Sequence, residues 1–125
     1  ELREKLFKGV VDDANAYGVI RDAYKLPKET EEEKVIRKQA IADAGVVGAS
    51  APLENAKLCR RVYDIGLKLD GKTNPNCYTD LAIGCELAKI GTNGCLMNID
   101  VNLPLVKDEA KLQEFNDAMK ELRIY

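Results

Sequence analysis

Asp13 is the residue of this chain whose setting most clearly suggests proton chemistry. The row to which it belongs at helical spacing is otherwise apolar: Leu6, Val10, Tyr17, Ile20 and Tyr24. Residues at such spacings share one face of a helix. A carboxylate on an apolar face is costly unless it is paired or hydrogen-bonded, so Asp13 is a candidate acid or base. The alternative is a purely structural pairing with a lysine or a helix N-terminus.

Asp80 is the second candidate carboxylate, and it begins another row. The residues that follow it at every third or fourth position are Gly84, Leu87, Gly91, Gly94, Asn98 and Asn102. Glycine inside a helix costs about 1 kcal/mol relative to alanine. Three glycines in one row therefore predict the close approach of another helix or of a ligand. Asp80 either interacts with the dipole in the first turn of its helix or points at that ligand.

Two amides and two lysines complete the set of candidate binding residues. Asn98 and Asn102 lie one turn apart, and paired amides can recognise a planar heterocycle through their donors and acceptors. They could equally tie helices together. Lys25 and Lys28 follow the first predicted helix and are candidate anion contacts, although exposed lysines at such places commonly have no ligand.

Composition excludes several other functions. Nineteen basic and 21 acidic residues leave a net charge of −2, which gives no basic footprint for nucleic acid. No window approaches the roughly 18 uninterrupted apolar residues of a membrane span. The four cysteines form no C-x-x-C pair, which argues against a zinc site, and the chain has no histidine to act as an acid or base. We expect buried free thiols in a reducing cytoplasm.

The elements that must position these residues are all predicted to be helices. Thr30 and Glu33 form a capping-box pattern, and Ser50 with Pro52 predicts the start of a separate helix. The expected helices cover residues 2–24, 31–49, 50–71, 75–102 and 108–122. The predicted fold is therefore an all-α antiparallel bundle of about five helices in a single domain, residues 1–125.

Five blocks occur in an order that resembles one family. They are DANAY at 13–17, YKLPKETEEEK at 24–34, Pro52-Leu53, NPN-x-x-x-D at 74–80 and GCLMNIDVNL at 94–103. Together they resemble the cyclodeaminase and methenyltetrahydrofolate cyclohydrolase family of folate one-carbon enzymes. Members of that family also carry an N-terminal helical region with a Thr-Pro-Gly-Gly-Gly-type motif. This sequence has no such motif, so the resemblance covers only the later two-thirds of the family domain.

The resemblance implies a homodimer that acts on a reduced folate, with no bound cofactor and no metal. It implies a cyclodeaminase, which would convert 5-formiminotetrahydrofolate to 5,10-methenyltetrahydrofolate and ammonia, or alternatively a cyclohydrolase. A formiminotransferase domain is the partner expected for the first. In this reading Asp13 moves protons, Asp80 stabilises positive charge, Asn98 and Asn102 orient the pterin, and Lys25 with Lys28 meets the glutamate tail. A catalytically silent helical dimerisation module remains the alternative of a different class.

Overall fold

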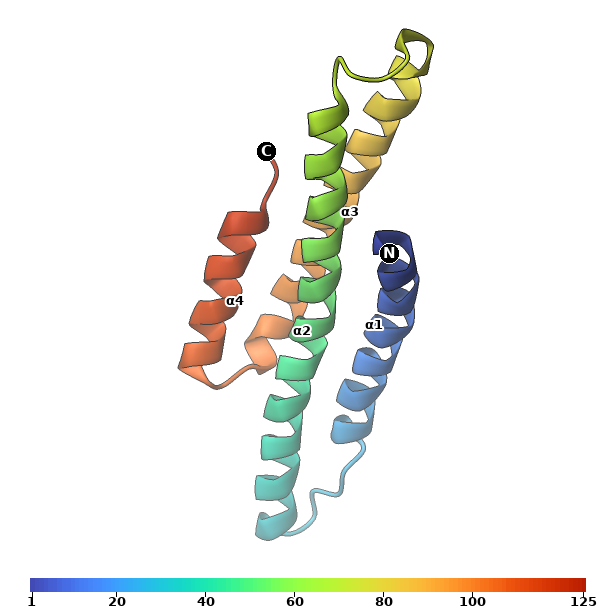
Figure 1. Cartoon of the computed structure of the whole chain (residues 1–125). Helices are drawn as coiled ribbons and strands as arrows, with labels where there is room; N and C mark the ends of the chain where they lie inside the picture. The colour runs from blue at the N-terminus through green and yellow to red at the C-terminus, as the bar shows by residue number, and fades with distance from the viewer.

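The chain folds into helices only, and the computed structural model describes all residues from 1 to 125 (Figure 1). Four α-helices and two short 3₁₀ turns follow one another: α1 (Leu2–Tyr24), α2 (Glu31–Leu69), η1 (Pro75–Cys77), α3 (Tyr78–Asn102), η2 (Leu103–Leu105) and α4 (Glu109–Leu122). The predicted all-α class is confirmed. None of these helices is both long and apolar enough to cross a membrane.

Helix α2 is the axis of the molecule. It runs antiparallel to α1 and to α3, which therefore run in the same direction, while the shorter α4 lies on the opposite side of α2 from α1 (Figure 1). Local signals begin its N-terminus as predicted, because the Thr30 hydroxyl accepts from the Glu33 amide and the Glu33 carboxylate accepts from the Thr30 amide. Gly71 closes the following turn with a positive φ of 68°, a conformation that glycine adopts at little cost.

The prediction of a separate helix starting at Ser50 was wrong, because α2 continues through Pro52. Ser50 does not cap a new helix; its hydroxyl donates to the Val46 carbonyl at 2.7 Å. Proline has no N–H to offer the carbonyl four residues earlier, which here belongs to Gly48. The side-chain amide of Asn102 donates to that carbonyl instead, at 3.0 Å. The chain therefore has four helices and not five.

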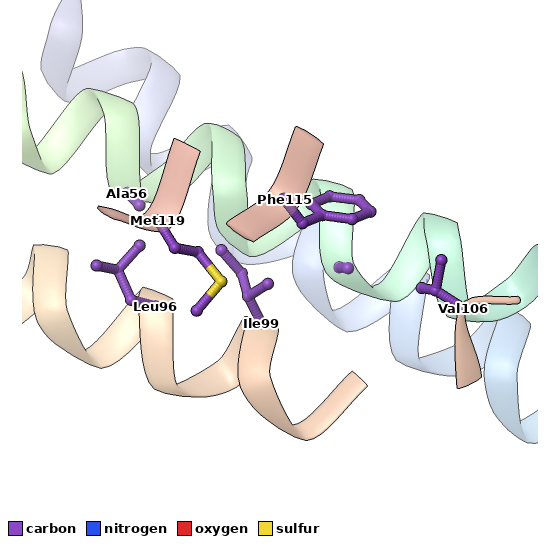
Figure 2. Packing of buried hydrophobic residues seen from close by; sticks show 7 residues of the cluster. Ala56, Leu96, Ile99, Val106, Phe115 and Met119 are labelled. Atoms are coloured by element: carbon purple, nitrogen blue, oxygen red, sulfur yellow. The ribbon is translucent and has the colours of Figure 1, made fainter. Parts of the chain in front are cut away.

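The main core lies between α2, α3 and α4. It consists of Ala49, Ala56, Leu96, Ile99, Val106, Phe115 and Met119, and Figure 2 shows Met119 beside Leu96 and Ile99. Phe115 and Met119 are the residues that α4 contributes to this core. Asp108, the residue at which the last helix was expected to begin, caps α4 by accepting from the Lys111 amide at 3.1 Å.

Helix α1 is held against α2 mainly by small residues, with Ile20 of the Asp13 row also lying against Gly48. Its buried positions are Gly9, Ala16 and Ala23, at intervals of seven residues, which allows its backbone to approach α2 closely. Gly9 has no room for a side chain, since a Cβ there would lie 1.9 Å from the Asn55 side-chain oxygen. The Asn55 amide also donates to the Gly9 carbonyl at 3.1 Å.

Candidate functional site

Asp13 lies where α1 and α3 meet. Its carboxylate accepts a hydrogen bond from the Asn98 side-chain amide at 3.4 Å, across 85 residues of sequence. Asp13 is half-buried, whereas Val10 and Tyr17 of its predicted row are 68% and 67% exposed. The row is therefore divided, because Leu6 and Ile20 are half-buried while its other apolar members are exposed. The carboxylate stands at the edge of a large exposed apolar face and is not enclosed within the bundle.

The two predicted amides form a short chain of hydrogen bonds that begins at Asp13. Asn102 donates to the backbone carbonyl of Asn98 at 3.2 Å and to that of Gly48 at 3.0 Å. Asn98 in turn donates to Asp13. Three of the predicted site residues, Asp13, Asn98 and Asn102, are thus brought together on two helices. Asn102 also has a structural role that the sequence interpretation had left open.

Two thiols adjoin this group, Cys59 of α2 and Cys95 of α3. The sulfur of Cys59 lies 3.1 Å from the position that a Cβ of Gly91 would occupy, so Gly91 allows it to approach α3. A hydrogen bond from Cys95 lowers the pKa of Cys59 to about 7. The same bond, followed by burial, by the Cys59 charge and by the nearby Asp13, raises the pKa of Cys95.

The cysteines are more accessible than the sequence suggested. Cys59, Cys85 and Cys95 are half-buried, and Cys77 is exposed in η1, so none is a fully buried thiol. No disulfide joins them. No group of three or more carboxylate, thiol or imidazole side chains is placed to hold a metal ion.

Asp80 does not join Asp13 within one chain. It is exposed in the first turn of α3, and its separation of 18 positions from Asn98 corresponds to about 27 Å of helix. The glycine row that follows it does not form one contact surface either. Gly91 packs against α2, but a Cβ at Gly84 or Gly94 would meet nothing within 4 Å.

The two predicted lysines lie beyond the C-terminal end of α1, further along that helix than Asp13. Lys25 is the exposed residue that ends α1, and its amide bonds the carbonyl of Asp22. Lys28 lies a little further on, at the wall of a pocket of about 490 Å³. A larger groove of about 920 Å³ between α1 and α2 is lined by Asp12 and not by Asp13.

Other polar residues that the sequence interpretation did not place have structural roles. The Asn93 side chain donates to the Ile124 carbonyl at 2.7 Å and accepts from the Ile124 amide at 3.1 Å. Arg60 donates to the Leu122 carbonyl at 3.1 Å and forms an ion pair with Asp64. These residues fasten the C-terminal end of α4 to α2 and α3. An asparagine in a glycine-rich helical stretch is the only signal that could have pointed to Asn93.

The profile of a family described as formiminotransferase-cyclodeaminase matches residues 1–121. This match covers α1, α2, α3, all but the last residue of α4, and the Asp13–Asn98–Asn102 group. The chain belongs to the formiminotransferase-cyclodeaminase family. The resemblance carried by the five sequence blocks is thereby confirmed.

Relatives of this family include enzymes with two different names. A methenyltetrahydrofolate cyclohydrolase of Methylorubrum extorquens is 32% identical over 121 residues, which cover 97% of this chain and 57% of that protein. A formimidoyltransferase-cyclodeaminase of Sus scrofa is 30% identical over 106 residues, or 85% of this chain and 20% of that protein. The corresponding protein of Mus musculus is 28% identical over 110 residues, with 88% and 20% covered. The chain thus spans little more than half the length of the cyclohydrolase and a fifth of the two-function proteins.

Proposed function

We propose that this chain acts on a reduced folate whose one-carbon unit lies between, or is transferred between, two nitrogens. The observation that carries the proposal is the Asp13–Asn98 pair, which joins an accessible carboxylate to an amide at the meeting of α1 and α3. Membership of the family and the names of the relatives supply the substrate class. The reaction requires a group that moves protons between nitrogens, and a carboxylate can do so.

The first candidate reaction is the cyclodeaminase reaction. N10 attacks the carbon of the protonated formimino group of 5-formiminotetrahydrofolate, a C–N10 bond forms, and the C–NH₂ bond then breaks to release ammonia. The proton lost from N10 has to reach the departing nitrogen. In our proposal Asp13 carries that proton, and its negative charge stabilises the amidinium-like cation that remains. Asn98 holds the carboxylate in place or turns to meet the pterin. Lys25 stays a proposed contact for the glutamate tail.

The second candidate is the cyclohydrolase reaction, which the 32% identical relative favours. Water adds to the bridging carbon of 5,10-methenyltetrahydrofolate, and the C–N5 bond breaks to give 10-formyltetrahydrofolate. One proton of the attacking water moves to N5, and the other is released to solvent. Both reactions pass through a tetrahedral carbon between two nitrogens, so the same carboxylate could serve either.

Absorbance of the methenyl chromophore separates the two reactions. The protein is offered 5-formiminotetrahydrofolate and 5,10-methenyltetrahydrofolate in separate reactions. Growth of the chromophore with release of ammonia from the first would establish a cyclodeaminase. Loss of the chromophore faster than the spontaneous rate with the second alone would establish a cyclohydrolase. If a folded protein changes the absorbance with neither folate, the result would favour a dimerisation module without catalytic activity.

We also propose that the chain forms a homodimer through α3. An exposed apolar stripe follows this helix, formed by Ile83, Leu87, Ile90, Met97 and Val101, which are 58–74% exposed. A stripe of this size on one helix is unusual for the free surface of a monomer. With Gly94 included, the spacing alternates four and three residues, as in the seam of a coiled coil.

The spacing of the stripe reads the same in both directions, which suits a twofold antiparallel pair of α3 helices. In that register Ile90 faces Gly94, a large residue against a small one. The same register carries the partner subunit's Asp80 toward the Asn102 end of this helix, which would bring the second predicted carboxylate to the site. We expect such a dimer to reside in the cytoplasm with its folate substrate.

Sedimentation velocity tests the dimer. Leu87→Glu, in the middle of the stripe, should give a monomer. Val35→Glu changes a residue in the second turn of α2 that is similarly exposed, at 68%, and should leave the dimer intact. A wild-type protein that sediments as a monomer at all concentrations would contradict the proposal.

A further inference from the structure

A basic pocket opens at the end of the molecule where α1 leads into α2. Its volume is about 490 Å³, and nine residues line it. Five of them are cationic and none is acidic: Lys28, Lys34, Arg37, Lys38 and Lys107. The apolar part of the wall comes from Ile41, Ala42 and Leu105, beside the ring of Tyr24. Such a concentration of one sign of charge in a concave site raises the local concentration of anions.

Arg37 gives this pocket a fixed cationic wall. Its Nη2 and Nε donate to the Tyr24 carbonyl at 3.1 and 3.4 Å, and its guanidinium lies 5.5 Å from the centre of the Tyr24 ring. The third guanidinium nitrogen makes no hydrogen bond to protein. A guanidinium held in this way is suited to binding a carboxylate.

Only one of the four lysines of this pocket is paired with a carboxylate, and two of the other three make no side-chain hydrogen bond to protein. Lys34 pairs with Glu31 at 2.7 Å, and the Lys107 ammonium donates to the Pro104 carbonyl. Lys28 and Lys38 make no ion pair with any carboxylate of the chain. Together with Arg37 they leave the charges that a ligand with more than one carboxylate would neutralise.

The pocket continues the line of the candidate site. Asp13 accepts a hydrogen bond from Asn98. Closer to the C-terminal ends of α1 and α3, Ile20 and Asn102 both lie against Gly48 of α2. Beyond the end of α3, Tyr24 and Leu105 line the pocket. Tyr24 follows Asp13 by three helical turns on the same side of α1, a distance of about 16 Å along the helix. An elongated ligand with a heterocycle at one end and carboxylates at the other would fit this line.

We propose that this pocket binds the glutamate carboxylates of the folate, while the pterin end lies at Asp13 and Asn98. The inference rests on the proposed function, because it assigns the second half of the same substrate. Lys28, Arg37 and Lys38 bind the two carboxylates of the glutamate. Ile41 and Leu105 offer an apolar surface to the aminobenzoyl ring, which precedes the glutamate in the folate. The pocket therefore sets the orientation of the substrate and excludes analogues that lack the amino-acid tail.

Fragments of the tail test the pocket directly. The titrated ligands are p-aminobenzoylglutamate and p-aminobenzoate, followed by chemical shifts of the protein amides. We expect the glutamate-bearing fragment to bind about tenfold more tightly, since several exposed ion pairs each contribute modestly. Lys28→Glu with Lys38→Glu should abolish that difference. The matched control, Lys68→Glu with Lys120→Glu, makes the same change of charge at residues outside the pocket and should preserve it.

Several results would overturn the assignment. Equal binding of the two fragments, or a difference that survives in the Lys28→Glu, Lys38→Glu protein with its helical circular dichroism intact, would remove the tail from this pocket. So would shifts confined to residues away from Arg37 and Tyr24. Because the fragments carry no pterin, these readings do not depend on any chemistry at Asp13.

A second titration separates this inference from the proposed function. Its ligand is 5-formyltetrahydrofolate, a stable reduced folate. Binding that is unchanged by Lys28→Glu with Lys38→Glu would overturn the pocket assignment and leave the proposed function standing. Absence of binding to the wild-type protein would overturn the proposed function, and the tail assignment would fall with it even if the small fragment bound.

Discussion

The side-chain amide of Asn102 takes the place of a backbone N–H that Pro52 lacks. It donates to the Gly48 carbonyl at 3.0 Å, and that carbonyl is the one four residues before the proline. Gly48 is buried, so without Asn102 its carbonyl would lose its partner away from water. This contact explains how a 39-residue helix passes through a proline, and it ties the end of α3 to the middle of α2.

Removing the amide should therefore be costly only while the proline is present. We expect Asn102→Ala to lower the free energy of unfolding by about 1–3 kcal/mol, the cost of a buried unpaired polar group. In a Pro52→Ala background residue 52 supplies its own N–H, and the same change should cost much less. Urea denaturation of the four proteins measures the coupling. Asn116→Ala, which removes an exposed bond to the Leu112 carbonyl, is the control.

Equal costs of Asn102→Ala in the two backgrounds would contradict this account. They would place the contribution of Asn102 elsewhere, for example in its bond to Asn98.

The sequence predicted the helices through their capping residues and failed where a distant residue decides. Thr30, Asp108 and Gly71 signal their ends locally, and the structure has them in those roles. Ser50 and Pro52 carry an equally good local signal for a helix start. What overrides it is Asn102, 50 residues further along the chain, and no local pattern contains that information. A tertiary hydrogen bond therefore explains why the helix start predicted at Ser50 does not occur.

Replacing the proposed acid should leave the fold intact and remove turnover. Asp13→Asn keeps the shape of the side chain and its reach to Asn98, so we expect unfolding free energy to change by no more than about 0.5 kcal/mol. If Asp13 transfers the proton, kcat should fall by about 10²–10⁴. Asp12→Asn, which alters the neighbouring residue paired with Lys8, should keep its activity. The measurement is the methenyl absorbance assay with either folate.

Unchanged turnover of Asp13→Asn would remove Asp13 from the mechanism. A loss shared equally by Asp12→Asn would point to a general effect of charge on α1.

Two glycines inside helices, Gly45 of α2 and Gly84 of α3, should show opposite changes in stability when replaced by alanine. At Gly45 a Cβ would lie 2.5 Å from the Leu105 Cβ and 3.0 Å from its backbone carbonyl carbon, atoms that cannot move without shifting η2. We expect Gly45→Ala to destabilise by about 1–3 kcal/mol. At Gly84 nothing lies within 4 Å, so Gly84→Ala should stabilise α3 by about 0.5–1 kcal/mol. Thermal unfolding of both proteins tests the pair, and destabilisation by Gly84→Ala would show that this face is covered.

The candidate site was predictable in part. Asp13, Asn98 and Asn102 were recognisable because each is a polar residue at a helical spacing that otherwise contains apolar or small residues. Their meeting depends on how α1 and α3 lie against α2, which is set by the close approach at Gly9 and Gly48. The partnership of Cys59 with Cys95 depends on the same packing and has no sequence signal.

The pairing of these two thiols should be visible in their reactivity. The pKa of Cys59 is lowered from 9.0 to about 7 by the hydrogen bond from Cys95. A lowered pKa means more thiolate at neutral pH: about half at pH 7, against about one in a hundred for a thiol with the ordinary value. Alkylation of Cys59 by iodoacetamide, followed by peptide mass spectrometry, should therefore rise with a midpoint near pH 7. Cys95→Ala removes the donor and should move that midpoint toward 9. A midpoint near 9 in the wild type, or one that Cys95→Ala leaves in place, would show that the two sulfurs do not interact.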